Sequence, residues 1–396
     1  MFKLFCLPKF YRQSMEPLRE HFQWGHFLTF CWLLFTMMLH HGPGNLRQIS
    51  TYIPLPYQLL TRLLSASYWY SSALWEQMLW LVLSKLPPPE DGICYVIADA
   101  TDAPKRSKQN PYARKGKKSK SDPWLFGLHI LVVSFQWSHW RIPVAFRLVK
   151  AKNSDGYVNE NTLLRELLPH VKFLLPSWTK QVIFLADAAY ASKENFRCLK
   201  KLKWDYVIAC AKTWNLADGT SLKNRLHRLQ KSQFHGTWLP SGKNGKRRRW
   251  FYARQESLNL NHLGDVTVVF SKTRRNNPSA SAKVLLTNLS NLSTRDILLI
   301  YQRRWHTEVM FKELKSGLGL GQMQVTKDEG RVERSIALSM MAYLCLLRLS
   351  LKSNSHAKSW SIFQAKWNLL AWVFQDRQLH FRKTEATTSD DYLAAG

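Results

Sequence analysis

The spacing of apolar residues changes near residue 90. Before that point they recur every three or four residues, the spacing of a helix with one buried face. The longest strongly apolar run, FLTFCWLLFTMML at 27–39, predicts a buried helix. Residues 45–67 hold two short amphipathic stretches separated by a proline-containing turn, a pattern that resembles a helix-turn-helix. A plain helical bundle accounts for the same pattern somewhat better.

Short continuous apolar runs, typical of buried strands, follow residue 90. They predict strands at 93–101, 126–137, 140–149, 181–190 and 204–211. Helical spacing predicts helices at 160–175 and 192–202, with a break in the first at Pro169. Strands and helices in this order indicate a mixed α/β fold.

Changes in amino-acid composition divide the chain into regions. The stretch LPPPED at 86–91 is a rigid linker and marks a boundary. Residues 212–290 alternate strand-like runs with turns rich in Gly and Asn, and we interpret them as a β-rich insertion. We therefore expect a helical domain at 1–90, an α/β domain at 91–330 and a helical region at 331–396.

The stretch YQRRWHTEVMFKELKSGLG at 301–319 predicts a helix with a narrow charged stripe. At about 100° per residue, four polar residues fall within an arc of roughly 60°: Tyr301, Arg304, Glu308 and Lys315. Apolar residues flank the stripe on both sides: Ile300, Phe311, Trp305 and Val309. Such a stripe suggests a helix that lines a polar cleft. Ordinary i,i+4 ion pairs on a solvated face explain this stretch equally well.

Both ends of this helix have sequence signals. Ser293 stands three residues before Asp296, which is the spacing of a capping box. Gly317 is the residue expected just past the end of the helix.

The net charge narrows the choice of partners. The 396 residues carry a formal net charge of +30, and 45% of them are hydrophobic, as in a globular protein. So much positive charge on a folded chain needs a polyanionic partner, most commonly nucleic acid. A membrane surface is the competing partner, but the longest apolar run is shorter than the ~18 residues that span a bilayer, and we expect no membrane association. No signal-peptide pattern is present, and six scattered cysteines indicate free thiols in a reducing cytoplasm.

Two basic runs are candidate DNA contacts. Between Ala103 and Lys120, eight of eighteen residues are Lys or Arg and none is acidic, and five of the seven residues from Lys243 to Arg249 are basic. Flexible cations of this kind neutralise DNA phosphates. The candidates are Lys105, Arg106, Lys117, Lys118, Arg247 and Arg248. The alternative for each run is a solvated loop.

Three carboxylates lie where a catalytic site is expected. Asp99 and Asp187 each end a strand-like run, and Glu308 lies on the charged stripe. If the strands are neighbours and the helix packs over their ends, the three side chains converge. They would repel one another without a cation between them, and Mg²⁺ or Mn²⁺ suits such oxygen ligands. Two ions roughly 4 Å apart can activate a water or a 3′-hydroxyl at a phosphodiester. Each Asp alone is equally explained as a helix N-cap.

These residues resemble a known family. Asp99 in VIADATDAPK, Asp187 in LADAAY and the four residues spaced Y-x2-R-x3-E-x6-K from Tyr301 to Lys315 resemble the DDE transposases of bacterial insertion sequences. The similar group is the one with the Y-R-E-K signature, of the insertion-sequence-four type. The resemblance covers about residues 90–325. Asp102 competes with Asp99 as the first acid, and we favour Asp99 because it directly follows the apolar run.

The resemblance implies a fold and a reaction. The core would be ribonuclease-H-like, with 212–290 as the insertion and 1–90 as a DNA-binding domain. Cut-and-paste transposition would nick the element end, form a hairpin, reopen it and join the end to target DNA. Asp99, Asp187 and Glu308 would hold the two metal ions, whereas Tyr301, Arg304 and Lys315 would contact phosphates. The residues that could stack on a flipped base are Trp238, Trp250 and Phe251.

The resemblance also implies partners and a location. We expect double-stranded DNA as terminal inverted repeats and as target, a homodimer on that DNA, and a cytoplasmic protein associated with the bacterial nucleoid. Two alternative functions would also explain the net positive charge, but neither includes the whole transposition reaction. They are a DNA-binding protein without catalysis and a metal-dependent nuclease without strand transfer.

Overall fold

The chain divides into two units, each built from segments far apart in the sequence. In the computed structural model the first, which we call the helical unit, contains residues 1–87, 102–129 and 311–396. The second, which we call the sheet unit, contains residues 88–101 and 130–310. The structure describes residues 6–40, 45–65, 69–104, 110–115, 126–241, 247–278, 281–323, 328–352 and 360–375.

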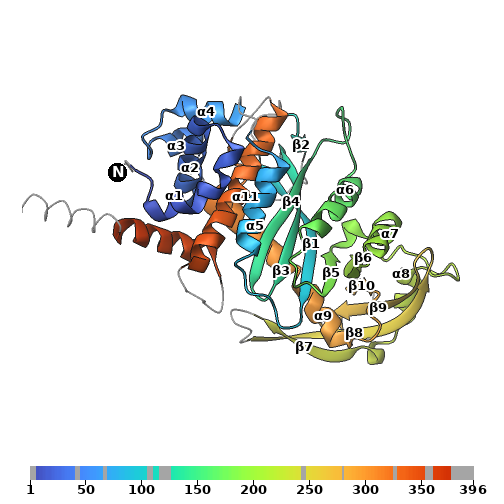
Figure 1. Cartoon of the computed structure of the whole chain (residues 1–396). Coiled ribbons are helices and arrows are strands. Elements are labelled where there is room, and N and C mark those ends of the chain that lie inside the picture. The colour runs from blue at the N-terminus through green and yellow to red at the C-terminus, as the bar shows by residue number, and fades with distance from the viewer. Residues whose placement is uncertain are drawn as a thin grey trace, which may run out of the picture. The chain divides into compact units, whose positions relative to one another are not determined.

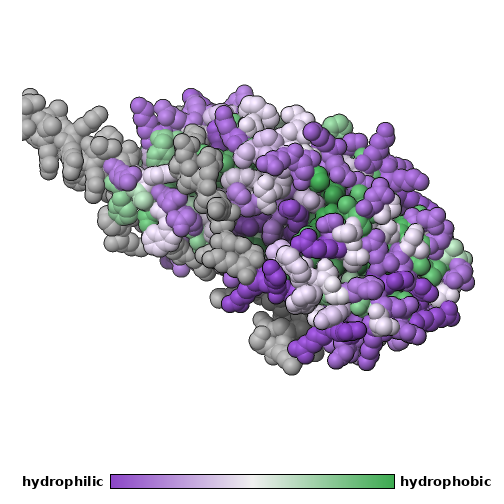
Figure 2. All heavy atoms as spheres, turned by 90° about the horizontal axis from the view of Figure 1, so that it is seen from below, coloured by the Kyte–Doolittle hydropathy of each residue, from purple (hydrophilic) through white to green (hydrophobic). Residues whose placement is uncertain are grey.

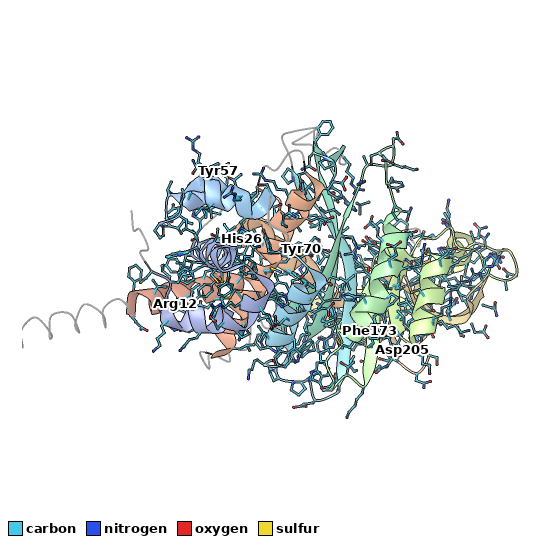
Figure 3. All side chains as sticks on the ribbon, turned by 45° about the horizontal axis from the view of Figure 1, so that its top comes forward. Arg12, His26, Tyr57, Tyr70, Phe173 and Asp205 are labelled. Carbon is cyan, nitrogen blue, oxygen red and sulfur yellow. The ribbon has the colours of Figure 1, made fainter. Side chains whose placement is uncertain are left out.

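Helices make up most of the helical unit (Figure 1). They are α1 (Lys9–Met15), η1 (Glu16–His21), α2 (Trp24–Leu39), α3 (Leu46–Ser50), α4 (Tyr57–Ser65), α5 (Ser72–Leu83), the second half of α10 (Trp305–Leu318) and α11 (Glu329–Lys352). Residues 362–375 are also helical. The outer faces carry exposed side chains such as Arg12 on α1 and Tyr57 on α4 (Figure 3).

The predicted helix over 27–39 is confirmed as α2, and it lies in the core. Phe30 is fully buried and packs against Phe22 and Trp69, with ring centroids 4.6 and 5.2 Å away. α2 and α5 both pack against α11. By length and composition α11 could cross a membrane, but 78% of its apolar window is buried inside the protein. It is therefore a core helix, and its apolar composition follows from burial on all sides.

Ten strands of the described residues form one sheet. They are β1 (Ile93–Pro104), β2 (Arg114–Lys115), β3 (Phe126–Trp137), β4 (Trp140–Val149), β5 (Gln181–Ala186), β6 (Asp205–Cys210), β7 (His235–Ser241), β8 (Arg247–Leu260), β9 (Gly264–Lys272) and β10 (Lys283–Thr287). Their order is β2-β3-β1-β5-β6-β10-β9-β8-β7, and β4 pairs with β3. β1, β5 and β6 are parallel neighbours, whereas the pairs from β6 through β10 to β7 are antiparallel. The mixed α/β fold is confirmed.

Helices cover both faces of the central strands. The helices of the sheet unit are α6 (Glu160–Phe173), η2 (Ala188–Tyr190), α7 (Lys193–Leu202), α8 (Leu222–Arg228), η3 (Lys231–Gln233), α9 (Thr294–Gln302) and the first half of α10. Ile297 and Leu298 of α9 pack with Ile97, Leu185, Val207 and other residues of one face. On the opposite face, Phe196 of α7 packs against Tyr206, with ring centroids 4.9 Å apart.

Several boundaries differ from the predictions. α6 continues through Pro169, because Leu164, Leu167, Leu168 and Val171 are buried along one face and hold the helix together. β1 extends to Pro104, beyond the predicted end. Gly317 lies inside α10, and Gly319, at φ 66°, is the left-handed residue after its end.

The stretch 301–319 is not one helix. α9 ends at Gln302 and α10 begins at Trp305, so the prediction of a continuous helix was wrong. At the junction the N–H groups of Arg304 and Thr307 donate to the carbonyls of Tyr301 and Arg304, at 3.1 and 3.0 Å, which are i→i−3 bonds. Trp305, a predicted apolar shoulder, is 61% exposed. The predicted N-cap is present, since Ser293 accepts from the Asp296 N–H at 3.2 Å.

The surface and the cysteines agree with a highly charged globular protein. Where the face in Figure 2 is coloured, hydrophilic residues cover most of it. All six cysteines are free thiols, as expected.

Candidate active site

Two parallel strands bring Asp99 and Asp187 side by side. β1 pairs with β5 so that Ile97 lies opposite Leu185 and Ala98 opposite Ala186. One further step along both chains places Asp99 opposite Asp187, on strands about 4.8 Å apart. Alternation along β1 also puts Asp99 on the face of Tyr95 and Ile97, which is the face that α9 covers.

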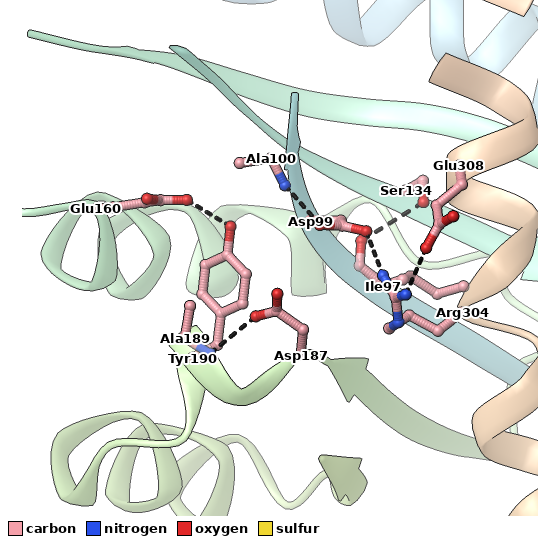
Figure 4. A network of polar contacts seen from close by, with 10 residues as sticks. All are labelled: Ile97, Asp99, Ala100, Ser134, Glu160, Asp187, Ala189, Tyr190, Arg304 and Glu308. Atoms are coloured by element: carbon pink, nitrogen blue, oxygen red, sulfur yellow. Dashed lines mark hydrogen bonds and ion pairs between the residues drawn. The ribbon is translucent and has the colours of Figure 1, made fainter. Parts of the chain in front are cut away.

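Hydrogen bonds fix the loop that carries Asp187. The Asp187 carboxylate accepts from the Ala189 N–H at 2.9 Å and so caps η2. The first turn of α6 holds this loop from outside. The Asn161 side chain donates to the Ala189 carbonyl at 3.1 Å, and the Tyr190 hydroxyl donates to Glu160 at 2.5 Å (Figure 4). Asp187 is therefore an N-cap, as its simpler explanation predicted, and also a neighbour of Asp99.

Arg304 joins Asp99 to Glu308. Its guanidinium donates to the Asp99 carboxylate at 2.6 Å and to the Glu308 carboxylate at 2.5 Å (Figure 4). Arg304 lies in the junction between α9 and α10, and Glu308 follows one turn later in α10. The Arg304 and Asp99 side chains are only 15% and 13% exposed, whereas Glu308 is 36% exposed. Arg304 thus bridges two of the three predicted acids, Asp99 and Glu308, and Asp187 acts on Asp99 through its charge.

Burial and charge act in opposite directions on Asp99. Burial raises its pKa to about 6, while the Arg304 charge and the Ala100 N–H, which donates at 2.9 Å, act to lower it. The negative charges of Asp187 and Glu308 raise it further. Burial alone would lower the pKa of Arg304, but the surrounding acids keep it raised. The site therefore holds more negative charge than its own cations balance easily.

Tyr301 and Lys283 complete the surroundings. Burial raises the pKa of Tyr301 to about 12, and the charge and hydrogen bond of the Arg304 side chain act to lower it. The Lys283 ammonium lies over the Tyr301 ring, 4.6 Å from its centroid. Burial and the Arg304 charge lower the Lys283 pKa, and Asp187 and Glu308 oppose that shift. Lys283 is thus a second cation near the acids.

Lys315 and Asp102 lie in the helical unit. Burial lowers the pKa of Lys315, and the charge of Asp102 opposes this. Asp102 has partners of its own, since its carboxylate lies 2.6 Å from His129 Nδ1 and 3.5 Å from Arg114. These contacts lower the Asp102 pKa. Asp102 is also three residues after Asp99, so strand alternation turns it to the other face of β1. This geometry favours Asp99 as the first acid.

Of the six basic residues that we predict to contact DNA, the structure describes two. Lys105, Arg106, Lys117 and Lys118 lie outside the described residues. Arg247 and Arg248 are exposed at the start of β8. The Arg248 guanidinium lies over the Trp238 ring at 4.7 Å, and Arg295 lies over the same ring at the same distance. Cations and aromatic rings therefore share one end of the β7–β8 pair.

The three candidate aromatic residues differ in exposure. Trp250 lies opposite Trp238 in the β7–β8 register and is 53% exposed. Phe251 packs against the core of the sheet unit. Trp250 is thus the one of the three with a ring free to stack on a base.

The acids need rearrangement before they can share an ion. Within the described residues no three His, Cys, Asp or Glu side chains lie close enough to hold one metal ion. The donors are nevertheless hard carboxylate oxygens, and the guanidinium between Asp99 and Glu308 shows that a positive charge is favoured there. The donor chemistry fits Mg²⁺ or Mn²⁺.

Sequence reasoning missed Lys283, Glu160 and Tyr190. Lys283 begins a short strand, and no spacing relates it to the acids. Tyr190 stands three residues after Asp187, and an aromatic residue so close to a strand-end acid was the available signal. Glu160 is recognisable only from the fold, because 30 residues separate it from Tyr190.

Comparisons with known proteins place the chain in one family. No curated protein matches the chain. Among solved structures it is similar to a cryo-EM structure of piggyBac transposase in a synaptic complex with hairpin DNA, at 10% identity and a TM-score of 0.49, over 91% of this chain and 75% of that one. The family model described as the transposase DDE domain matches residues 90–345, well over half of the chain. This protein therefore belongs to the family of the transposase DDE domain.

Proposed function

We propose that this protein is a DNA transposase that moves an insertion sequence by a cut-and-paste reaction, in the group with the Y-R-E-K signature. The observation that carries the proposal is that Arg304 bridges Asp99 and Glu308 while Asp187 acts on Asp99 through its charge, in a chain of this family. The three acids come from a strand, the loop after a second strand and a helix, and they are 88 and 121 residues apart in the sequence.

A ribonuclease-H-like core is supported by the strand order. β4, β3, β1, β5 and β6 are consecutive in the sheet, and β1, β5 and β6 run parallel. β3 and β4 are joined by the two residues Ser138 and His139, so they form an antiparallel hairpin. β7, β8 and β9 extend the sheet beyond β10 and correspond to the proposed insertion at 212–290.

Asp99, Asp187 and Glu308 would hold two divalent ions, Mg²⁺ or Mn²⁺. Such ions polarise the phosphodiester, make the attacking oxygen a better nucleophile and stabilise the leaving oxygen. The protein's own part is to orient the carboxylates and to keep Asp99 ionised. Ionisation of Asp99 is sensitive to nearby positive charge because burial raises its pKa to about 6.

Cations near the acids would position the DNA backbone. Arg304 presents a planar fork of donors, the geometry that suits phosphate oxygens. Lys283 would contribute a point charge, and the Tyr301 hydroxyl would donate to a phosphate. Lys315, in the helical unit, would contact a phosphate as well. Arg247, Arg248, Lys105, Arg106, Lys117 and Lys118 would contact further phosphates of the DNA. Trp250 would stack on a flipped base during the hairpin step.

The partners follow from the reaction. The substrates would be double-stranded DNA ending in the element's inverted repeats and a target duplex. A homodimer would pair the two ends, with residues 1–90 contributing to DNA binding. We place the protein in the bacterial cytoplasm, on the nucleoid.

The test is cleavage of a duplex ending in the element's terminal repeat. Asp99→Asn, Asp187→Asn and Glu308→Gln each remove one charge at nearly constant volume. Each should lower Mg²⁺-dependent nicking on the order of a hundredfold or more, because no remaining group replaces a metal ligand. DNA affinity measured without divalent metal should stay near the wild-type value. Asp265→Asn, at an exposed position on β9, is the matched control and should keep full activity.

Other outcomes separate the alternatives. Full nicking by Glu308→Gln would contradict the proposed catalytic acid. DNA binding by the wild type without any nicking would indicate a non-catalytic DNA-binding protein. Nicking without joining of the 3′ end to a target duplex would indicate a nuclease that lacks strand transfer.

A further inference from the structure

The Arg304 guanidinium lies between the Asp99 and Glu308 carboxylates, in the position that a metal ion bound by both would take. Its two terminal nitrogens each contact a different carboxylate, Asp99 at 2.6 Å and Glu308 at 2.5 Å. The guanidinium is 15% exposed, so little water screens these contacts. Arginine stays protonated at every pH at which the protein is folded. The contact can therefore be broken by a competing ion but not by loss of a proton.

The negative charge of the three acids explains the close contacts that Arg304 makes with Asp99 and Glu308. Asp99, Asp187 and Glu308 interact through their charges, and Asp99 is buried. Among the described residues, Arg304 and Lys283 act on this cluster through their positive charges, and they also repel each other. Without Arg304, two of the three carboxylates would lose their direct counter-ion. Their mutual repulsion would then favour uptake of another cation.

The same geometry prevents the acids from sharing an ion as they stand. No three acidic, His or Cys side chains of the described residues lie close enough to hold a metal. The guanidinium separates Asp99 from Glu308, and its fork occupies one oxygen of each. A divalent ion that used both carboxylates would have to displace Arg304.

We infer that Arg304 is an internal counter-ion that competes with divalent metal for Asp99 and Glu308, and that DNA relieves this competition by accepting the guanidinium on a phosphate. The inference rests on the proposed function and adds a means of regulation to the same site. Metal affinity would be low in free protein and would rise on DNA. By linkage, DNA affinity would rise by the same factor on metal.

The position of Arg304 makes such an exchange feasible. It lies between two helices, not inside one, so its backbone is held by short i→i−3 bonds at the junction. Its side chain can change partner while α9 stays packed through Ile297 and Leu298. The neighbouring Arg303 has a different role, because its guanidinium lies over the Tyr95 ring at 4.4 Å.

The experiment measures Mn²⁺ affinity of the full chain by the electron paramagnetic resonance signal of free Mn²⁺. In the absence of DNA, Arg304→Gln should bind Mn²⁺ roughly tenfold or more tightly than the wild type, because a competing charge has been removed. Arg303→Gln is the matched control and should leave the Mn²⁺ affinity unchanged. Equal or weaker Mn²⁺ binding by Arg304→Gln would overturn the inference.

A second measurement needs no variant and so does not depend on the folding of Arg304→Gln. Wild-type affinity for Mn²⁺ should rise roughly tenfold or more when a terminal-repeat duplex is added. No rise would overturn the inference. The inference would also be overturned if Asp99→Asn and the wild type bound Mn²⁺ equally well. If both Mn²⁺ results hold but the duplex is never nicked, the counter-ion role stands and the proposed transposase activity fails.

Discussion

At the scale of single residues, neighbours decide what each side chain can do. Asp99 and Asp187 could be identified from the sequence because each directly follows a buried apolar run, and the parallel pairing of β1 with β5 brings the ends of these runs together. Arg304 and Glu308 could be identified from their spacing. The ion pairs among these residues could not be predicted, since Asp99 and Arg304 are 205 positions apart. Lys283 gave no sequence signal.

Exposure separates the aromatic residues of the β7–β8 pair. We predict that Trp250→Ala lowers hairpin formation about tenfold or more, because stacking on one base contributes about 1–3 kcal/mol. The first nick should be unaffected, and the free energy of unfolding should change by less than about 0.5 kcal/mol because the ring is largely exposed. Gel analysis of nicked and hairpin products on terminal-repeat DNA measures both steps.

Trp80→Ala is the matched control, since Trp80 on α5 is also well exposed, at 66%. It should leave both products at wild-type levels. Equal hairpin yields from Trp250→Ala and the wild type would remove Trp250 from the proposed reaction.

At the scale of elements, the strands were the easiest to predict and the helix junction the hardest. The boundaries of β3 and β4 agree with the apolar runs at 126–137 and 140–149. The junction between α9 and α10 contains neither Pro nor Gly, so nothing local marks it. It follows from tertiary contacts, since Arg303 lies over Tyr95 and Arg304 reaches Asp99. Long-range contacts thus overrode a helical pattern.

The first turn of α6 acts as a clamp on the loop that presents Asp187. We predict that Tyr190→Phe slows nicking severalfold without changing DNA affinity, because it removes the hydrogen bond to Glu160. A hydrogen bond to a charged group contributes about 1.5–3 kcal/mol, so the loop should also open more often. Hydrogen exchange of the amides at 187–191 measures this opening.

Tyr206→Phe provides the comparison, because Tyr206 is also buried but packs through its ring against Phe196. It should leave both exchange and nicking unchanged. Unaltered exchange at 187–191 in Tyr190→Phe would show that the hydroxyl does not restrain the loop.

At the scale of the whole molecule, one lysine joins the ends of three helices in the helical unit. Lys366, in the helix at 362–375, is 1% exposed and donates to the carbonyls of Met37, His40 and Gly317. These carbonyls lie at the ends of α2 and α10, where the last carbonyls of a helix have no partner within the helix itself. The ammonium therefore links the last helix of the described chain to two earlier ones.

We predict that Lys366→Met destabilises the protein by about 2–4 kcal/mol, because three buried carbonyls lose their donor. Lys312→Met, at an exposed position on α10, is the control and should change stability by less than about 0.5 kcal/mol. Urea unfolding at pH 7 measures the difference. A change for Lys366→Met as small as that for the control would contradict this role.

The pH dependence of stability gives a second check on Lys366. Burial lowers its pKa from 10.5 to about 8 in the folded protein. Between these values the unfolded chain binds more protons than the folded one, so the Lys366 contribution to unfolding free energy rises with pH from about 8 to 10.5. The wild type should show this rise relative to Lys366→Met, and parallel pH profiles would contradict it.

The register between β1 and β5 ties chemistry to folding. Tyr95, Ile97 and Asp99 share one face of a strand whose other face is also buried, so inserting or deleting a single codon in 93–98 would exchange the side chains of the two buried faces relative to Asp99. Such a lesion would damage the hydrophobic core and misalign the acid in the same event. Genetic decay by frame-preserving slippage at this strand would therefore leave an unfolded product, not a stable inactive copy that still competes for DNA.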